Sequence, residues 1–379
     1  MRNAARLLAG GMAATVLSAG LVAAPAGAAT TTTGTTATAS PKNAAKTAPK
    51  NAAARWLTGQ LTDGLVHNDH YDYDDYGLTA DVALALDGVG GRAAQAKAVR
   101  KALAPHVDSW TTGVDHGSDD VYAGSVAKAA VVAQRTGGDA RRFGGVDLVE
   151  RLEGRVLTSG AARGRIQDQG SADYATTLGQ AFAAEALSVA GSKRAAAAVR
   201  FLLAQQCGAG YFRVTLDPAD ASTQTCAEAR RAQAKPSVDA TAAAVLSLRE
   251  VPQQTAKVRR AIKAALAWLA KRAQRDGLYA SEGQRTGGDP NANSTGLAAW
   301  ALGDAGRCGA ARTAARGVAK LQLSGSYGGT PLAGEKGAVP FDRAAKLAGR
   351  DGIAVAERDQ WRRATAQSTP GLAYVAGCR

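Results

Sequence analysis

One repeated pattern constrains the fold of this chain more than any other feature. A Leu-rich segment, often ending in Gln, is followed by a Gly, then by a loop, and then by a run of small apolar residues that begins near a Thr. Clear copies begin at Arg55, Phe201 and Ala267, and more degenerate copies begin at Val99, Leu148 and Val318. Such repetition indicates one helical hairpin used several times, because a single hairpin cannot bury its apolar face alone.

The two helices predicted in each copy differ in character. The second helix, as over residues 241–248, is small and apolar nearly all round, which is typical of a buried helix. The first helix, as over residues 257–272, carries charges on one side and should lie outside. We therefore expect an all-α fold of about six hairpins, arranged as a closed ring with two concentric layers. The second helices should begin near the anchor hydroxyls of Thr79, Ser125, Thr177, Thr241, Thr295 and Thr369.

The beginning of the chain has the composition of a targeting segment followed by a tether. Two arginines precede an apolar run that ends near a small-x-small cleavage site, so residues 1–28 are predicted to be a secretory signal peptide. The alternative is a single membrane anchor. Residues 29–51 are mostly Thr, Ala, Lys and Pro and should form a flexible tether. The folded domain should then span residues 52–379, and the mature chain should be secreted, monomeric and without a membrane span.

The chain has four cysteines, Cys207, Cys226, Cys308 and Cys378. An even number in an exported chain suggests disulfides, and the Cys-x-x-Cys spacing of a zinc site is absent. Of the three possible connectivities we favour the sequential one. Cys207–Cys226 would close a loop within one repeat, and Cys308–Cys378 would tie the C-terminus to a turn between hairpins.

The formal net charge is +14, and the basic residues are scattered along the predicted helices. We interpret them as a solvated outer surface. The functional alternative is a weak attraction to acidic cell-wall polymers or to membrane surfaces. A nucleic-acid partner is not expected, because only 5% of the residues are aromatic and no basic stripe with interleaved aromatics is present.

Loop lengths along the chain are unequal. The connections from a first helix to a second are long, whereas those from a second helix to the next first helix are short. In an alternating ring all the long loops then lie on one rim, beside the N-termini of the inner helices. Binding should occur at this rim, where those helices also present their positive dipole ends.

Two segments resemble the repeat of a known family. Gln322-Leu-Ser-Gly-Ser-Tyr327, and more loosely Gln205 to Tyr211, are similar to degenerate copies of the Gln-to-Gly-x-Trp repeat of squalene cyclases. Residues 52–377 resemble the α/α toroid shared by triterpene cyclases, protein prenyltransferases and cobalamin-binding transport proteins. The closest likeness is to exported bacterial prenyltransferase/squalene-oxidase-repeat proteins. The resemblance implies an (α/α)6 toroid and is weak for activity.

The same resemblance identifies two candidates for a catalytic acid. Asp72-Tyr-Asp74-Asp75 matches the Asp-x-Asp-Asp motif of class II terpene cyclases, in which a protonated carboxyl donates its proton to an alkene or epoxide. Here the motif lies about one helical turn from the Thr-Ala pair that should follow it. The repeat with the right spacing keeps only its middle acid, Asp239. Ser237 and Ala240 stand where the flanking carboxylates should be.

Three features count against a working cyclase. Asp239 lacks its partner acids. The predicted inner helices supply only Trp300 and a few Tyr, whereas cyclases line their cavity with aromatic rings that stabilise carbocations. A class II cyclase is also expected to need a second helical domain, for which the chain has no room. We therefore predict that the chain is not a working terpene cyclase.

Two polar loops of the first hairpins form a candidate rim site. One contains His70, Asp72, Asp74 and Asp75, and the other contains His116, Asp119 and Asp120. If the loops meet, they could bind a divalent cation such as calcium or provide a carboxylate pair that acts on a glycan. We favour the simpler interpretation, a solvated acidic rim with helix caps at Asp75 and Asp120, because the spacing matches no ligand template. No resident metal or cofactor is therefore predicted.

Prenyltransferase-like zinc is not expected either, because the predicted disulfides use every Cys. The catalytic residues are unknown. We expect a binding protein whose ligand is a small molecule in the central mouth or a surface polymer on the rim. The candidate binding residues are Asp72, Asp74, Asp75, Asp119, Asp120, His70, His116, Asp239 and Trp300. A glycan-processing enzyme is the first alternative, and a class II terpene-cyclase-like enzyme is the second.

Overall fold

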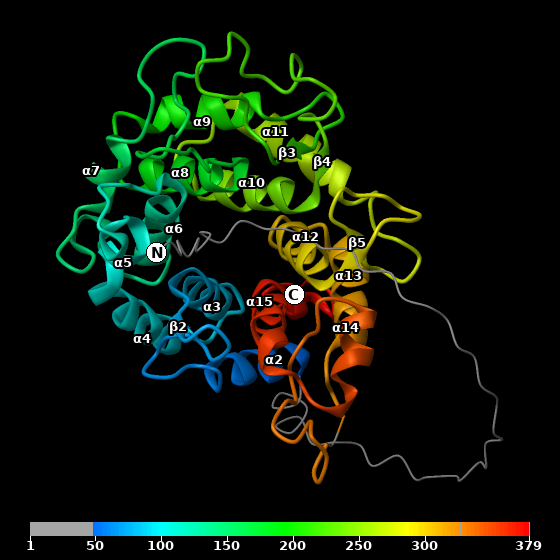
Figure 1. Ribbon diagram of the computed structural model, residues 1–379. Helices are drawn as coiled ribbons and strands as arrows, with labels where there is room; N and C mark the ends of the chain where they lie inside the picture. Colours follow the sequence, from blue (N-terminus) through cyan, green and yellow to red (C-terminus); the bar gives the residue numbers. More distant parts are fainter. Residues whose placement is uncertain (1–47, 326, 379) are drawn as a thin grey trace, which may run out of the picture. The chain divides into compact units, whose positions relative to one another are not determined.

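A computed structural model describes residues 48–325 and 327–378 (Figure 1). The predicted signal peptide, residues 1–28, lies outside the described residues, as does the predicted tether up to residue 47. The first described helix, α2 (Pro49–Thr58), begins within the last residues assigned to the tether. In this part of the chain, no helix is long and apolar enough to cross a membrane.

Helices supply most of the regular structure, as the repeat predicts. The inner helices are α3 (Tyr76–Gly88), α6 (Ala123–Arg135), α8 (Thr177–Val189), α10 (Val238–Glu250), α12 (Ala292–Asp304) and α15 (Arg358–Ser368). The outer helices are α2, α4 (Ala93–Leu103), α7 (Leu148–Glu153), α9 (Ala195–Ala204), α11 (Ala256–Leu269) and α13 (Cys308–Leu321). Shorter pieces include α5 (Val107–Thr111), α14 (Arg343–Ala348) and the 3₁₀ turns η2 (Val114–His116) and η6 (Gly371–Tyr374).

The six inner helices contact one another in a closed cycle. Each packs against the next in chain order, and α15 packs against α3 (Figure 1). Each outer helix packs on the inner helix that precedes it, and α2 packs on α15. Two concentric helical layers result, so the predicted all-α toroid of six hairpins is confirmed.

Three short antiparallel strand pairs occur in the loops that lead to inner helices. They are β1 (His67–Asn68) with β2 (Tyr73–Asp74), β3 (Phe212–Arg213) with β4 (Pro236–Ser237), and β5 (Tyr279–Ala280) with β6 (Pro290–Asn291). The pairs lead directly into α3, α10 and α12, respectively. The long loops therefore lie at the N-terminal ends of the inner helices, as expected from their lengths.

Threonine hydroxyls connect several of the long loops to the inner helices that follow them in the chain. In three hairpins the expected Thr accepts a hydrogen bond at Oγ1 from a loop backbone N–H and donates one to the carbonyl four residues earlier. The loop donors for Thr79, Thr241 and Thr295 are Val66, Phe212 and Tyr279. The side chain therefore holds the loop against the first turn of the helix.

The expected helix starts are confirmed at Ser125 and Thr177, because α6 begins at Ala123 and α8 at Thr177, but α15 begins at Arg358, well before Thr369. The loop contacts differ from the pattern in three hairpins. In the last hairpin Thr365 accepts from the Val339 N–H, so the anchor lies one helical turn before Thr369. In the third, Gln180 Oε1 accepts from the Ile166 N–H, and the longer side chain replaces Thr177. Ser125 makes no such bond within the described residues. The Thr-x-Ala spacing alone does not distinguish hydroxyls one turn apart.

A Gly and a Gln of the repeat join neighbouring outer helices. Gly337 has φ +107°, and a Cβ there would lie 2.2 Å from the Ala52 carbonyl oxygen of α2. Gln322 Nε2 donates to the carbonyls of Gly337 and Pro49, both at 3.0 Å. Only glycine allows this approach, and the amide bridges the loop to the next helix. The last hairpin is thereby joined to the first.

Polar side chains reinforce the same junction. Arg362, 6% exposed, donates from Nη1 to the His67 carbonyl at 2.6 Å and to Asp359 Oδ1 at 2.7 Å. Trp56 Nε1 donates to Glu335 Oε2 at 2.7 Å. The Arg362–His67 and Trp56–Glu335 bonds join residues 295 and 279 positions apart, so they close the ring where chain connectivity does not.

All four cysteines form the two expected disulfides, Cys207–Cys226 and Cys308–Cys378. The first lies in the long loop after α9, and the second joins the start of α13 to the segment after η6. Bridges of this kind stabilise mainly by restricting the unfolded chain. The sequential connectivity is therefore the one present in the structure.

Candidate functional site

The side chains that line the ring differ between two groups of inner helices. On each inner helix, one face is covered neither by an outer helix nor by a neighbour in the ring. On α8, α10 and α12 that face is largely apolar. We call this the apolar half, and it comprises Leu178, Phe182, Ala243, Leu246, Leu297 and Trp300. Leu178, Phe182, Leu297 and Trp300 are only partly buried, so other side chains do not cover this surface completely.

The opposite helices, α15, α3 and α6, present charges instead. We call Asp75, Asp81, Lys128 and Arg363 the charged half. Lys128 Nζ lies 2.5 Å from Asp81 Oδ1 and donates to the Gly77 carbonyl at 2.8 Å. Arg363 contacts Asp75 at 3.3 Å and Asp81 at 3.6 Å. Each carboxylate therefore has a cation beside it, and the group cross-links three helices.

Asp239 lies in the first turn of α10, at the rim of the apolar half. Ser237 is the N-cap of this helix and accepts from the Ala240 N–H. Burial raises the pKa of the Asp239 carboxyl, and a hydrogen bond with Ser294 opposes that shift. Its Oδ1 is buried without a hydrogen-bond partner among the described residues. The carboxyl is thus held toward its neutral form beside an unsatisfied acceptor.

Two further polar atoms near the starts of neighbouring inner helices are also buried without a hydrogen-bond partner. Asn293 Oδ1 on α12 and Thr177 Oγ1 on α8 are buried and find no partner within residues 48–325 and 327–378. The helices α8, α10 and α12 are consecutive in the ring. Buried polar atoms without partners are uncommon in folded proteins, so these oxygens can accept hydrogen bonds from water or from a ligand.

Trp300 reaches across the ring from α12. A Cβ on Gly88, the last residue of α3, would lie 2.6 Å from its Cζ2. The Arg135 guanidinium of α6 lies 5.9 Å from the centre of its ring. Neither α3 nor α6 neighbours α12 in the ring, so the indole closes the end opposite the long loops. Trp300 therefore lies well inside the ring, away from the rim.

Arg135 also pairs with Glu185 of α8, where the charged and apolar halves meet. Arg135 Nε and Nη2 donate to the two carboxylate oxygens at 2.5 and 2.8 Å. Glu185 is only 1% exposed. Burial raises the pKa of Glu185, and Arg135 and Ser247 oppose the shift. A two-point pair of this kind is among the stronger charge-assisted contacts in proteins.

The first acidic loop is occupied by contacts of its own. Asp74 Oδ1 lies 3.0 Å from His67 Nδ1, and Asp72 lies 3.4 Å from the other ring nitrogen. The hydrogen bond with Asp74 is the main cause of a raised pKa at His67. Asp75 caps α3 by accepting from the Leu78 N–H. His70 packs edge-on against Tyr71.

The second acidic loop does not provide the expected helix cap. Tyr122 occupies the N-cap of α6 without a side-chain cap bond in the described chain. The Ala123 N–H is instead bound at 2.6 Å by Asp168, which comes from the following hairpin. The prediction of Asp120 as the helix cap was therefore wrong, because the side chain that bonds the start of α6 is Asp168, which is distant in sequence. His116 lies in the turn η2, and Asp119 accepts a bond from Gln169 through its carbonyl.

Asp74 and Asp115, one from each loop, both raise the pKa of Tyr76, whose burial is the larger cause. No direct contact joins the candidate residues of the two loops within the described residues. In that part of the chain, no group of three or more His, Cys, Asp or Glu side chains is placed to hold a metal ion. The pairing of Asp81 with Lys128 was not predicted, because the pattern within one helix does not show which side chains face each other across two helices.

Comparison with known proteins identifies the fold alone. No protein-family model and no curated protein matches the chain. Among solved structures it is similar to a variant of the type II terpene cyclase MstE from Scytonema in complex with geranylgeranyl dihydroxybenzoate. That likeness has 16% identity and a TM-score of 0.54, and it covers 86% of this chain and 96% of that one. A protein from Actinoplanes is 18% identical, with a TM-score of 0.55 and coverage of 86% and 99%.

The MstE comparison corrects one expectation. A single toroid of this size covers almost the whole of that type II terpene cyclase. The expected need for a second helical domain was therefore wrong, and chain length does not argue against cyclisation. Two features still count against cyclisation: the few aromatic side chains in the ring lining, and the absence of partner acids beside Asp239. The chain thus has the α/α toroid fold found in type II terpene cyclases.

Proposed function

We propose that this protein binds an amphipathic small molecule inside the ring and does not convert it. The observation that carries the proposal is the pairing of an apolar half with unsatisfied buried oxygens at its rim, on Asp239 and Asn293. An apolar body would pack on Leu297 and Phe182. A polar head would complete the hydrogen bonds that the protein leaves open.

The two open oxygens narrow the chemistry of the head group. Asp239 Oδ1 and Asn293 Oδ1 both act as hydrogen-bond acceptors. A hydroxyl or phenol can donate to them, whereas a carboxylate has no proton to donate. The MstE ligand, geranylgeranyl dihydroxybenzoate, joins an apolar chain to a benzoate ring that bears two hydroxyls. Its apolar chain and its hydroxyl donors match the proposed class, whereas its benzoate group would have to lie away from Asp239 and Asn293.

The case against conversion rests on the lining. Protonation of an alkene leaves a carbocation, which needs aromatic faces along its path. In the apolar half these are Phe182 and Trp300, and Trp300 is already covered by Arg135. A cation next to the ring occupies the face that a carbocation would need. Asp239 also lacks flanking carboxylates, since Ser237 and Ala240 occupy those places.

One observation favours a second candidate, a class II terpene-cyclase-like enzyme. Burial already raises the pKa of Asp239, as a general acid that protonates an alkene requires. A glycan-processing enzyme has less support. It would need two free carboxylates across the mouth, whereas Asp74 is paired with His67 and Asp75 caps α3 and contacts Arg363.

The test has a binding arm and a conversion arm. Native mass spectrometry of the freshly purified chain should show a retained small molecule, which denaturation releases. The chain is then incubated with geranylgeranyl dihydroxybenzoate, and the extract is analysed by liquid chromatography and mass spectrometry. We expect saturable binding with unchanged compound. A cyclised isomer whose formation disappears in Asp239→Asn would establish the enzyme and overturn the binding-only proposal.

Two variants and a control locate the site. Phe182→Ala should weaken binding about tenfold by removing apolar contact, and Asp239→Asn should alter it by changing the head-group partners. Asp220→Asn, in an exposed loop, should leave binding unchanged. Equal affinity of all three variants and the parent would place the ligand elsewhere.

Secretion and a monomeric state belong to the same proposal. Two disulfides support an oxidising compartment. Expression of residues 1–379 should release a shortened chain into the medium, and N-terminal sequencing should place the cut near residue 28. A full-length, membrane-associated product would instead support the membrane anchor.

A further inference from the structure

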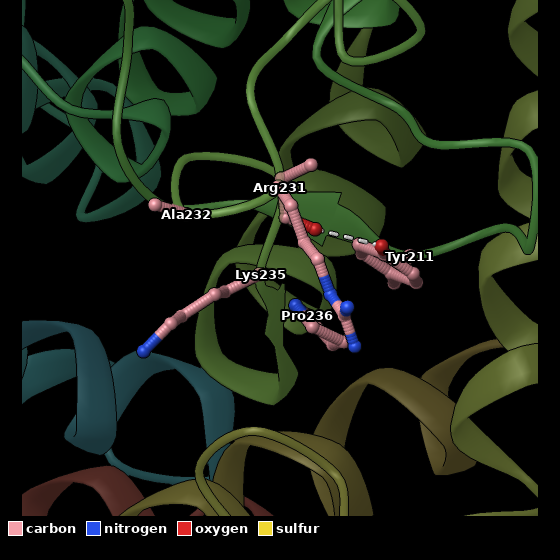
Figure 2. A pocket seen from close by; sticks show the side chains of 6 residues that line it. Tyr211, Arg231, Ala232, Lys235 and Pro236 are labelled. Atoms are coloured by element: carbon pink, nitrogen blue, oxygen red, sulfur yellow. Dashed lines mark hydrogen bonds between the residues drawn. The ribbon is translucent and has the colours of Figure 1, made fainter.

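A pocket of about 590 Å³ opens in the long loop between β3 and β4. Its walls are Tyr211, Arg231, Ala232, Ala234, Lys235 and Pro236, drawn in Figure 2. The volume is that of a small-molecule site. The pocket includes no residue of the apolar half, so occupancy here does not depend on the proposed central ligand.

Two cations give this pocket its charge. Arg231 and Lys235 are exposed, and Figure 2 shows the two side chains extending from the loop in different directions. Arg231 has no hydrogen-bond or ion-pair partner among the described residues. Lys235 has one weak contact, with Glu282 at 3.7 Å, and both side chains are about half exposed or more. The wall therefore carries two positive charges, of which one is unpaired.

The remaining wall is apolar and held in place. The Tyr211 hydroxyl donates to the Ala234 carbonyl at 2.7 Å, the dashed line of Figure 2. Its ring lies 5.5 Å from that of the buried Trp268, and the Arg272 guanidinium lies 4.9 Å from the centre of the Trp268 ring. Pro236 is fixed in β4 opposite the fully buried Arg213. An aromatic face and a proline ring are thus preset beside the cations.

We propose that this pocket binds an organic anion with a flat apolar body, such as an aromatic carboxylate. The body packs against Tyr211 and Pro236, and the carboxylate lies between Arg231 and Lys235. A guanidinium presents two parallel N–H groups that match both carboxylate oxygens, and an ammonium adds a point charge. A cationic ligand of the same shape meets like charges and is rejected.

Isothermal titration calorimetry with three matched probes tests the charge requirement. The probes are 2-naphthoate, 2-naphthalenemethanol and 2-naphthylmethylammonium, which share the ring system and differ in charge. We expect naphthoate to bind at least tenfold more tightly than the alcohol, and the ammonium not to bind. Added salt should weaken naphthoate binding and leave the alcohol unaffected. Equal binding of naphthoate and the alcohol overturns the proposal.

Substitutions then locate the site. Arg231→Gln should weaken naphthoate binding about tenfold while alcohol binding stays constant. Glu282→Gln should tighten binding by a small factor, because that carboxylate competes for Lys235. Arg231, Lys235 and Glu282 are all exposed, so both variants should fold as the parent does, and circular dichroism checks this.

A second basic pocket provides the matched control. It has a volume of about 200 Å³ and includes Arg100, Lys101 and Arg142. Arg142→Gln should leave naphthoate binding unchanged. If Arg142→Gln abolishes binding and Arg231→Gln does not, the anion binds at the second pocket and the assignment to the β3–β4 loop is wrong.

Discussion

The charged half and the apolar half of the ring satisfy their polar groups in opposite ways. In the charged half, Asp75 and Asp81 are both within ion-pair distance of Arg363, and Asp81 also pairs with Lys128. In the apolar half, Asp239 and Asn293 each leave a buried oxygen without a partner among the described residues. Both halves consist of inner helices that pack in the same ring, and they differ in the side chains that line it.

This contrast separates a structural role from a binding role. A polar group that is satisfied inside the protein gains nothing from a ligand and stabilises the ring. A buried polar group that is not satisfied costs stability, and a ligand can remove that cost. We therefore expect substitutions in or near the charged half to change stability, and those around Asp239 to change ligand binding.

The largest change should follow loss of Arg135, which lies where the two halves meet. Arg135→Met leaves Glu185 buried and unpaired, and removing one partner of a buried pair typically costs about 3–5 kcal/mol. The measurement is urea unfolding at pH 7. Because burial raises the pKa of Glu185, the unpaired group can take up a proton, so the loss should shrink as the pH falls.

The double variant Arg135→Met/Glu185→Met is the control for this prediction. It removes both charges and keeps apolar volume, so it should recover most of the stability. A single variant as stable as the parent would mean that the pair contributes nothing to the closed ring. The halves would then be joined by packing alone.

Two glycines offer a matched pair for the packing itself. A Cβ on Gly88 would lie 2.6 Å from the Trp300 ring, so Gly88→Ala should cost about 1–3 kcal/mol. A Cβ on Gly124 of α6 would have its nearest neighbour at 3.9 Å, so Gly124→Ala should be tolerated and should gain up to about 1 kcal/mol from helix propensity. Thermal unfolding of both variants provides the comparison. Equal effects would show that Trp300 does not close the end of the ring.

The fold was predictable from sequence because it depends on local and repeated signals. The Gly–Gln pattern follows from contacts such as those of Gly337 and Gln322, which need a particular residue at a particular place. The predictions that failed concern contacts that the repeat pattern does not specify. Gln180 replaces a Thr because a longer side chain reaches the same N–H, and Asp168 caps a helix from another hairpin.

The candidate site was less predictable for the same reason. The sequence identified Asp239 through its spacing, and the structure places it at a buried rim. The acid-rich loop around Asp74 was a candidate site in the sequence, but in the structure the carboxylates of Asp72 and Asp74 contact His67. The pairing of Asp81 with Lys128 depends on which helices become neighbours in the ring, and no single segment encodes that.

A smaller effect should distinguish the acids of that loop. Asp75 caps α3, so Asp75→Ala should cost about 1 kcal/mol. Asp72 is almost fully exposed but has a φ of 55°, which Asn adopts more readily than Ala, so Asp72→Asn should change stability by less than about 0.5 kcal/mol. Chemical denaturation of both variants decides between a capped helix start and a shared acidic site. Similar losses in both, together with a rise in melting temperature on adding calcium, would support a cation site on the rim.

The smallest change in stability should follow Asp239→Asn at acidic pH, because an amide replaces a protonated carboxyl of the same shape. Burial raises the native pKa of Asp239 above its ordinary value of 3.8, so the native state retains its proton more readily than the unfolded state does. The stability that this group contributes is therefore complete below about pH 3.8 and is lost as the pH rises through the native pKa. The Asn variant has no proton to lose. Its stability relative to the parent should increase from pH 4 to pH 7.5 in urea unfolding, whereas that of Asp220→Asn should stay constant. A relative stability that falls over this range would mean that Asp239 is held as an anion, and a cationic head group would then replace the hydroxyl proposed for the central ligand.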